Sequence, residues 1–118
     1  MKLRLRIFIY KGGKRLSKED LKERTDNFGR GLRYITEFKY LEASKWLLLS
    51  EDSFEKYALL CLINIALGYR EGAVEYMEAS VNYKPQDEIY FVVDNPEKNF
   101  KKEIRCWDDL SELMDLIF

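Results

Sequence analysis

The sequence contains no histidine, two cysteines and two prolines among its 118 residues. Without histidine, the chain lacks the side chain that most often serves as a general base or a metal ligand. Cys61 lies in an apolar run and Cys106 lies beside Trp107, and neither has an activating base nearby in the sequence. We therefore expect no enzymatic activity, no metal and no cofactor. Nothing in the sequence requires a disulfide between the two cysteines, and free thiols are typical of a cytoplasmic protein. The sequence leaves the redox state of Cys61 and Cys106 open.

Long apolar runs are absent as well. The longest near the start is "IFIY" at residues 7–10, whereas a membrane-spanning helix needs about 20 apolar residues. We expect no membrane span and no secretory signal. The composition, 47% hydrophobic and 14% aromatic, instead predicts a packed globular fold. The length predicts a single domain over residues 1–118.

The net charge of −1 conceals an uneven distribution. Residues 1–33 carry eleven Lys/Arg and four Asp/Glu, a net charge of +7. Residues 34–100 carry six and twelve, a net charge of −6, and residues 101–118 carry three and five, a net charge of −2. Such asymmetry indicates either a basic face for an anionic partner or neutralisation of the two parts within the fold.

Two segments have the pattern of β-strands. Residues 2–10, "KLRLRIFIY", alternate with period two, so one face is apolar and the other is cationic and aromatic. The glycines of "KGGK" then predict a turn. Residues 88–93, "EIYFVV", are rich in aromatic and β-branched residues, and residues 100–107 form a weaker second candidate. These segments predict a small sheet.

The first helix is predicted to start at Lys18, with Ser17 as its N-cap. Gly29 and Gly31 interrupt it, so the helix either continues to Phe38 or breaks near "DNFGRG". The sequence leaves this choice open.

Further helices are predicted over residues 41–50, 54–67 and 70–83. The second is apolar on nearly every side, has Asp52 or Ser53 as its cap and ends at Gly68. The third places Met77 and Val81 inward and stops at Pro85. A last helix begins after Asp109, with Glu112 in the capping-box position. The predicted fold class is α+β, with central antiparallel helical hairpins and a C-terminal capping helix.

The central helices contain a weak internal repeat. Residues 31–50 and 61–80 align with identities at Leu32/Leu62, Ile35/Ile65, Ala43/Ala73 and Ser50/Ser80. The run "ALGYREGAVEYMEASVNYKP" resembles the second half of a tetratricopeptide repeat, with Gly68, Ala73, Met77 and Pro85 at the motif positions. Thirty residues earlier, Gly31, Tyr34, Ala43 and Leu47 match more weakly, without the proline. The resemblance covers residues 24–85.

This resemblance implies peptide binding on the concave surface formed by the first helix of each pair. The corresponding positions are Thr25, Phe28, Leu32, Glu55, Ala58 and Leu62. They are mostly apolar and lack the Lys, Asn and Arg of the family's carboxylate clamp. We therefore expect the concave face to be covered by the chain's own strands or final helix.

Three functions are compatible with the sequence. The first is a non-enzymatic module that docks one protein partner. The second is an immunity or antitoxin protein, because the ending "IRCWDDLSELMDLIF" resembles the ends of several such proteins. Its acids would oppose a basic nuclease, although at a helix start they also favour the dipole and solubility. These candidate partner-binding residues are Asp108, Asp109, Glu112 and Asp115.

The third function is nucleic-acid binding through the basic N-terminal strand, in which cations and aromatic rings alternate. Its alternative is that the aromatic rings are covered and the arginines pair with the acidic body. The candidate residues are Arg4, Arg6, Phe8, Tyr10, Lys11, Lys14 and Arg15.

Overall fold

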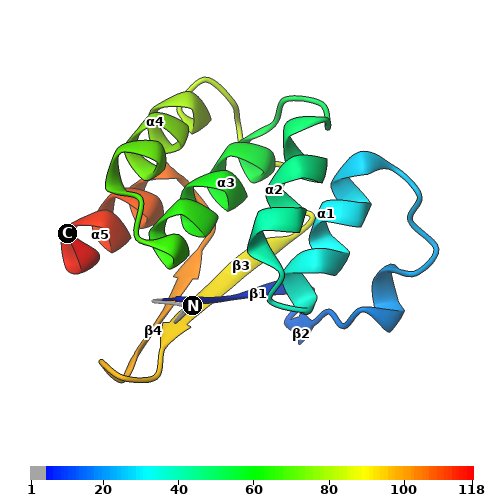
Figure 1. Ribbon diagram of the computed structural model, residues 1–118, viewed down its shortest axis with the longest axis horizontal. Coiled ribbons are helices and arrows are strands. Elements are labelled where there is room, and N and C mark those ends of the chain that lie inside the picture. Colours follow the sequence, from blue (N-terminus) through cyan, green and yellow to red (C-terminus); the bar gives the residue numbers. More distant parts are fainter. Residues whose placement is uncertain (1–4) are drawn as a thin grey trace.

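The computed structural model describes residues 5–118, which form five α-helices, one short 3-10 turn and a four-stranded antiparallel sheet (Figure 1). The predicted α+β class is confirmed. The elements in chain order are β1 (Arg6–Lys11), β2 (Lys14–Arg15), η1 (Glu19–Leu21), α1 (Asn27–Thr36), α2 (Tyr40–Leu48), α3 (Phe54–Leu67), α4 (Arg70–Ser80), β3 (Tyr90–Asn95), β4 (Phe100–Ile104) and α5 (Trp107–Ile117).

The sheet has the strand order β2-β1-β3-β4 and the helices lie on one side of it (Figure 1). The period-two pattern of the first strand sets this arrangement, because alternate side chains point to opposite faces. Ile7 and Ile9 are buried, and Ile7 lies opposite Val93, which is also buried. Helices α1 and α3 contact β1, and α5 contacts β4.

The first strand is shorter than the prediction of residues 2–10, and Lys2, Leu3 and Arg4 lie outside the described residues. The predicted glycine turn is present. Gly12 and Gly13 have φ angles of 58° and 80°, which suit a two-residue hairpin loop. The turn leads into β2, a strand that sequence reasoning missed because it has two residues.

The prediction of a helix starting at Lys18 is wrong. Ser17 and Asp20 exchange hydrogen bonds around a single 3-10 turn, and α1 begins at Asn27 after the cap Asp26. The glycines do not break the helix but lie inside it. A Cβ added to Gly29 would come 2.6 Å from the Cβ of Arg24, so the glycine lets the preceding loop fold back onto the first turn.

Helix α3 is the centre of the core, as its apolar sequence predicts. Of the two predicted caps, Ser53 is the one used: its hydroxyl accepts from the backbone N–H of Lys56 at 3.0 Å. Gly68 ends the helix with a φ of 83°. The helix packs against α2 and α4, and α1 packs against α2. Ala43 and Ala73, the paired alanines of the repeat, are both fully buried.

Other boundaries differ from the predictions. Helix α1 ends at Thr36, because Phe38 adopts a left-handed φ of 60°. Helix α4 ends at Ser80, well before Pro85, so Val81 lies beyond the helix and is 56% exposed instead of inward. Helix α5 begins at Trp107 with Cys106 as the N-cap, whereas Asp109 was predicted to be the cap. Asp109 is instead the third helical residue and closes the capping box.

The Tyr40 hydroxyl pairs with a buried backbone N–H at the part of β1 that has no neighbouring strand on that side. Strand β2 pairs with Tyr10 and Lys11 only, so the N–H of Ile7 has no strand partner and instead donates to the Tyr40 hydroxyl at 2.8 Å. Tyr40 is 2% exposed, and burial raises the pKa of its hydroxyl to about 12.

We expect Tyr40→Phe to lower the free energy of unfolding by about 1–3 kcal/mol, because it leaves the Ile7 N–H buried and unpaired. Urea unfolding followed by circular dichroism measures the change. Tyr69→Phe is the matched control, since Tyr69 is 53% exposed. Equal midpoints for the two variants would show that the hydroxyl has no role in covering the strand edge.

Candidate functional site

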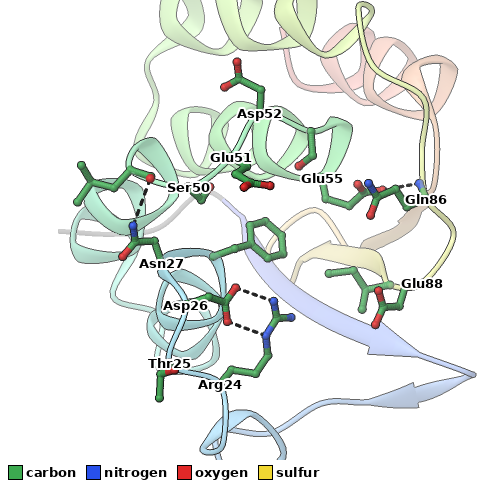
Figure 2. A pocket seen from close by; sticks show the side chains of 14 residues that line it. Arg24, Thr25, Asp26, Asn27, Ser50, Glu51, Asp52, Glu55, Gln86 and Glu88 are labelled. Carbon is green, nitrogen blue, oxygen red and sulfur yellow. Dashed lines mark hydrogen bonds and ion pairs between the residues drawn. The ribbon is translucent and has the colours of Figure 1, made fainter.

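A cleft of about 620 Å³ lies between the start of α1, the loop joining α2 to α3, and the segment before β3 (Figure 2). We call it the acidic cleft. Its lining contains five carboxylates and one guanidinium. The lining residues are Arg24, Thr25, Asp26, Asn27, Phe28, Leu49, Ser50, Glu51, Asp52, Ser53, Glu55, Gln86, Glu88 and Ile89.

The single guanidinium of the cleft is already neutralised. Arg24 makes two hydrogen bonds to Asp26, at 3.1 and 2.7 Å, and Asp26 also accepts from the N–H of Gly29 at 3.2 Å. The Arg24 guanidinium thereby holds the pKa of the Asp26 carboxyl below its usual value. The lining therefore carries an excess of carboxylates: Asp52 and Glu88 have lysine partners, whereas Glu51 and Glu55 make no ion pair among residues 5–118.

Glu55 is the most deeply buried acid of the cleft, with 6% of its surface exposed. One carboxylate oxygen accepts from the N–H of Gln86 at 3.0 Å (Figure 2). The other oxygen has no donor among residues 5–118, and no buried side-chain oxygen in that part of the chain is unsatisfied, so this oxygen reaches the solvent of the cleft.

Two exposed acids complete the negative lining. Glu51 makes no ion pair within the described part of the chain, whereas Glu88 pairs with Lys11 at 3.7 Å. A weak, exposed pair of this kind contributes little and is readily exchanged for another cation.

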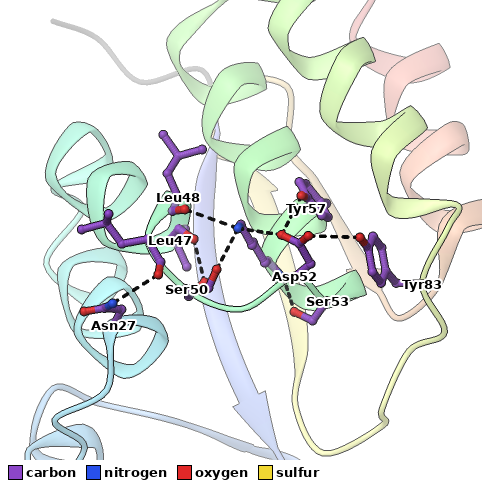
Figure 3. A network of polar contacts seen from close by, with 10 residues as sticks. Asn27, Leu47, Leu48, Ser50, Asp52, Ser53, Tyr57 and Tyr83 are labelled. Carbon is purple, nitrogen blue, oxygen red and sulfur yellow. Dashed lines mark hydrogen bonds and ion pairs between the residues drawn. The ribbon is translucent and has the colours of Figure 1, made fainter.

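A polar network holds one wall of the cleft in place (Figure 3). Lys56, 5% exposed, donates to the carbonyl of Ser50 at 2.8 Å, to that of Leu48 at 3.4 Å and to Asp52 at 3.0 Å. Asp52 also accepts from the hydroxyls of Tyr57 and Tyr83, at 2.8 and 3.2 Å. The network links the end of α2 to the start of α3 and to the segment after α4.

These contacts shift the pKa values of the network. The Lys56 ammonium, followed by the Tyr57 hydroxyl, lowers the pKa of Asp52. The same hydrogen bond to Asp52 raises the pKa of Tyr57 to about 12. At neutral pH the wall therefore holds an ionised Asp52 and a protonated Tyr57.

The floor and rim of the cleft are apolar. Phe28 is half-buried and packs against the core, and Ile89 does the same from the segment before β3. Leu49, which follows α2 and also lines the cleft, is 67% exposed. A lining of this kind complements a ligand whose basic groups are carried on apolar chains, because the charges can meet the carboxylates while the chains pack on the apolar side chains.

The concave positions implied by the repeat resemblance divide into two groups. Leu32, Ala58 and Leu62 are fully buried, and β1 contacts the helices that carry them. Thr25, Phe28 and Glu55 line the acidic cleft. The first group therefore lies in the core, and the second group lies at the cleft, where Glu55 is 6% exposed.

The acids of α5 lie apart from this cleft. The Asp109 carboxylate accepts from the N–H groups of Arg105 and Cys106, at 2.8 and 3.3 Å, and so serves the helix start. Glu112 pairs with Lys102 at 2.6 Å. Asp108 and Asp115 are exposed. Two of the four predicted partner-binding residues thus have structural partners within the chain.

Most cations of the candidate nucleic-acid face also have partners. Arg6 makes two bonds of 2.8 Å to Asp94, Lys11 pairs with Glu88 and Lys14 with Asp20. Arg4 lies outside the described residues.

The aromatic residues of that face are engaged in the same way. The guanidinium of Arg15 lies 4.1 Å from the centroid of the Phe8 ring. The rings of Tyr10 and Tyr90 are 5.6 Å apart. Of the two arginines described on this face, Arg6 pairs with Asp94, as the alternative predicts, whereas Arg15 lies over Phe8 of the same N-terminal segment.

Both cysteines are free thiols. Burial raises the pKa of Cys61 to about 12, so its thiolate is scarcely populated at neutral pH. Within residues 5–118, no three or more acidic or cysteine side chains are grouped to hold a metal ion, and no helix is both long and apolar enough to cross a membrane.

The repeat resemblance points to Thr25, Phe28 and Glu55 of the cleft, but the sequence alone does not join them to the other acids of the lining. Asp52 and Ser53 have the sequence signal of helix caps. The available signal was Glu55 itself, a carboxylate beside Lys56 in the first turn of a helix that is apolar from Ala58 onward apart from Asn64. Comparison with known proteins adds no assignment: no family model, curated protein or solved structure matches this chain.

Proposed function

We propose that this protein is a non-enzymatic binding module that docks a basic segment of one protein partner in the acidic cleft. The observation that carries the proposal is the cleft itself, whose lining places five carboxylates and one guanidinium around Phe28 and Ile89, with Glu51 and Glu55 free of ion pairs among residues 5–118. A lysine or arginine side chain offers both the charge and the apolar stem that this lining complements.

The geometry supports a rigid docking site. The Lys56 network anchors one wall, and the Glu55–Gln86 hydrogen bond ties the segment before β3 to α3. A preformed site loses little conformational entropy when its ligand binds.

The test compares the wild type with Glu51→Lys/Glu88→Lys. Both residues are exposed, so the substitutions cancel the net negative charge of the lining while the core is retained. The matched control is Glu71→Lys/Glu75→Lys, which makes the same change of charge on exposed positions of α4. Each tagged protein captures partners from nuclease-treated native cell extract, and calorimetry measures the binding of a hexalysine peptide.

We expect the wild type and the α4 control to retain one partner that the cleft variant loses. We also expect the cleft variant to bind hexalysine at least about tenfold more weakly. Equal capture and equal peptide binding by all three proteins would refute docking in the cleft. Capture that disappears after nuclease treatment would favour nucleic-acid binding instead.

A narrower form of the proposal is that the partner is a basic nuclease toxin and the protein is its immunity protein. The acidic cleft favours it, because a negative surface steers and complements the cationic face of a nuclease. Co-expression should then protect cells from a toxin encoded beside this gene, and the cleft variant should protect less. If the toxin killed cells equally well with and without the wild-type protein, the immunity-protein hypothesis would be wrong.

A further inference from the structure

A second groove, of about 310 Å³, is lined mainly by cations, in contrast to the acidic cleft. It is lined by Lys18, Arg30, Arg33, Tyr34, Glu37 and Trp46, and we call it the cationic groove. The three cations outnumber the single carboxylate. Sequence reasoning identified none of these residues as a site.

The lysine of the groove is neutralised, but the arginines are not. Glu37 accepts from Lys18 at 2.6 Å and from Lys39 at 3.7 Å, which lowers the pKa of its carboxyl. Arg30 and Arg33 are half-buried, and neither makes an ion pair with a carboxylate of residues 5–118. A guanidinium withdrawn from water without a carboxylate partner leaves its donors available to an external anion.

The arrangement of these arginines is set by the helix and by Trp46. Positions 30 and 33 are three residues apart on α1, so the two side chains lie on neighbouring turns of the same face. The Arg30 guanidinium lies over the Trp46 ring, 4.9 Å from its centroid. A guanidinium that stacks on an aromatic ring keeps its edge free, and that edge can donate two parallel hydrogen bonds to one carboxylate.

We propose that the cationic groove binds an acidic segment of a protein partner, through carboxylates held by Arg30 and Arg33. A protein segment fits better than a nucleic-acid strand, because the positive surface is short. On the segment before α1, Lys14, Lys22 and Arg24 are paired with Asp20, Glu19 and Asp26. The acidic cleft at the start of the same helix would also repel a long polyanion.

The experiment uses a hexaglutamate peptide and the indole N–H resonances of the two tryptophans, assigned with Trp107→Phe. The variant is Arg30→Gln/Arg33→Gln. The control is Lys45→Gln, which removes an exposed cation from the same helix as Trp46. Parallel titrations use hexalysine and a thymidine oligonucleotide, and the dispersion of the spectrum shows that each variant is folded.

We expect hexaglutamate to shift the Trp46 resonance and to leave that of Trp107 unchanged. The double variant should bind about tenfold more weakly or worse, while the lysine control binds as the wild type does. No shift at Trp46, or a shift that survives the double substitution, would overturn the proposal. A tighter response to the oligonucleotide than to the peptide would overturn it in favour of nucleic acid.

The result is independent of the proposed docking in the acidic cleft. Glu51→Lys/Glu88→Lys should still shift the Trp46 resonance with hexaglutamate, at least as strongly as the wild type, since its substitutions lie outside the cationic groove and remove negative charge from the cleft.

Discussion

Phe91→Ala is expected to lower the free energy of unfolding by about 3–5 kcal/mol, the largest effect we predict for a single substitution in this protein. Phe91 has the largest side chain among the fully buried residues, with 1% of its surface exposed. It lies on the inner face of β3, opposite Ile104 of β4 and Ile9 of β1. Its removal opens a cavity beneath the helices, and the lost burial and the cavity both cost stability.

Urea unfolding monitored by circular dichroism measures this effect. Phe118→Ala is the matched control, because Phe118 is 42% exposed and should change the stability by less than about 1 kcal/mol. Phe91→Leu retains most of the volume and should recover most of the loss. If Phe91→Ala were as stable as Phe118→Ala, the sheet would contribute little to the core, and the helices would be stable without it.

Lys56→Met is expected to lower the free energy of unfolding by about 2–3 kcal/mol. Methionine has a similar length, so the substitution removes the ammonium group and keeps the packing of the stem. The carbonyls of Leu48 and Ser50 then lose a charged donor, and Asp52 loses its cation. Because Lys56 is 5% exposed, water replaces these bonds poorly.

The matched control for Lys56 is Lys45→Met. Lys45 is exposed on α2, so its loss should change the stability by less than about 0.5 kcal/mol. Chemical denaturation of both variants gives the comparison. A stabilised Lys56→Met would mean that the cost of burying the ammonium exceeds the gain from its three bonds, which is known for some buried ion pairs.

The loss of the Lys56 network also has a consequence for binding. The network fixes the wall formed by the loop between α2 and α3. If the proposed docking is correct, a folded Lys56→Met protein should bind the hexalysine peptide more weakly, because the wall must be ordered on binding.

The sequence by itself determined the elements whose signals are local. The alternation in residues 6–11 predicts which side chains of β1 are buried, because the period of two is a property of the strand. The ends of α3 are equally local: the Ser53 hydroxyl bonds three residues ahead, and Gly68 supplies the left-handed conformation. Such contacts form within one turn, so the residues that make them are close in the sequence.

The start of α1 shows where local rules were insufficient. Ser17 and Asp20 form the hydrogen bonds of a helix start, yet the helix does not continue beyond one turn. The chain instead leaves η1 and folds back over Gly29, where the absence of a Cβ makes room for Arg24. That choice depends on packing between segments, which the capping pattern does not contain.

The two candidate sites were decided by tertiary structure alone. Asp26, Glu55 and Glu88 come from three separate segments and line one cleft. The hydrogen bond from the Gln86 N–H to Glu55 joins two of these segments, although its residues are 31 positions apart in the sequence. In the same way, the cationic groove exists because the Arg30 guanidinium of α1 lies over the Trp46 ring of α2, 4.9 Å from its centroid. Charge counts along the chain predict neither site, because a carboxylate that caps a helix and one that faces a cleft have the same sequence signal.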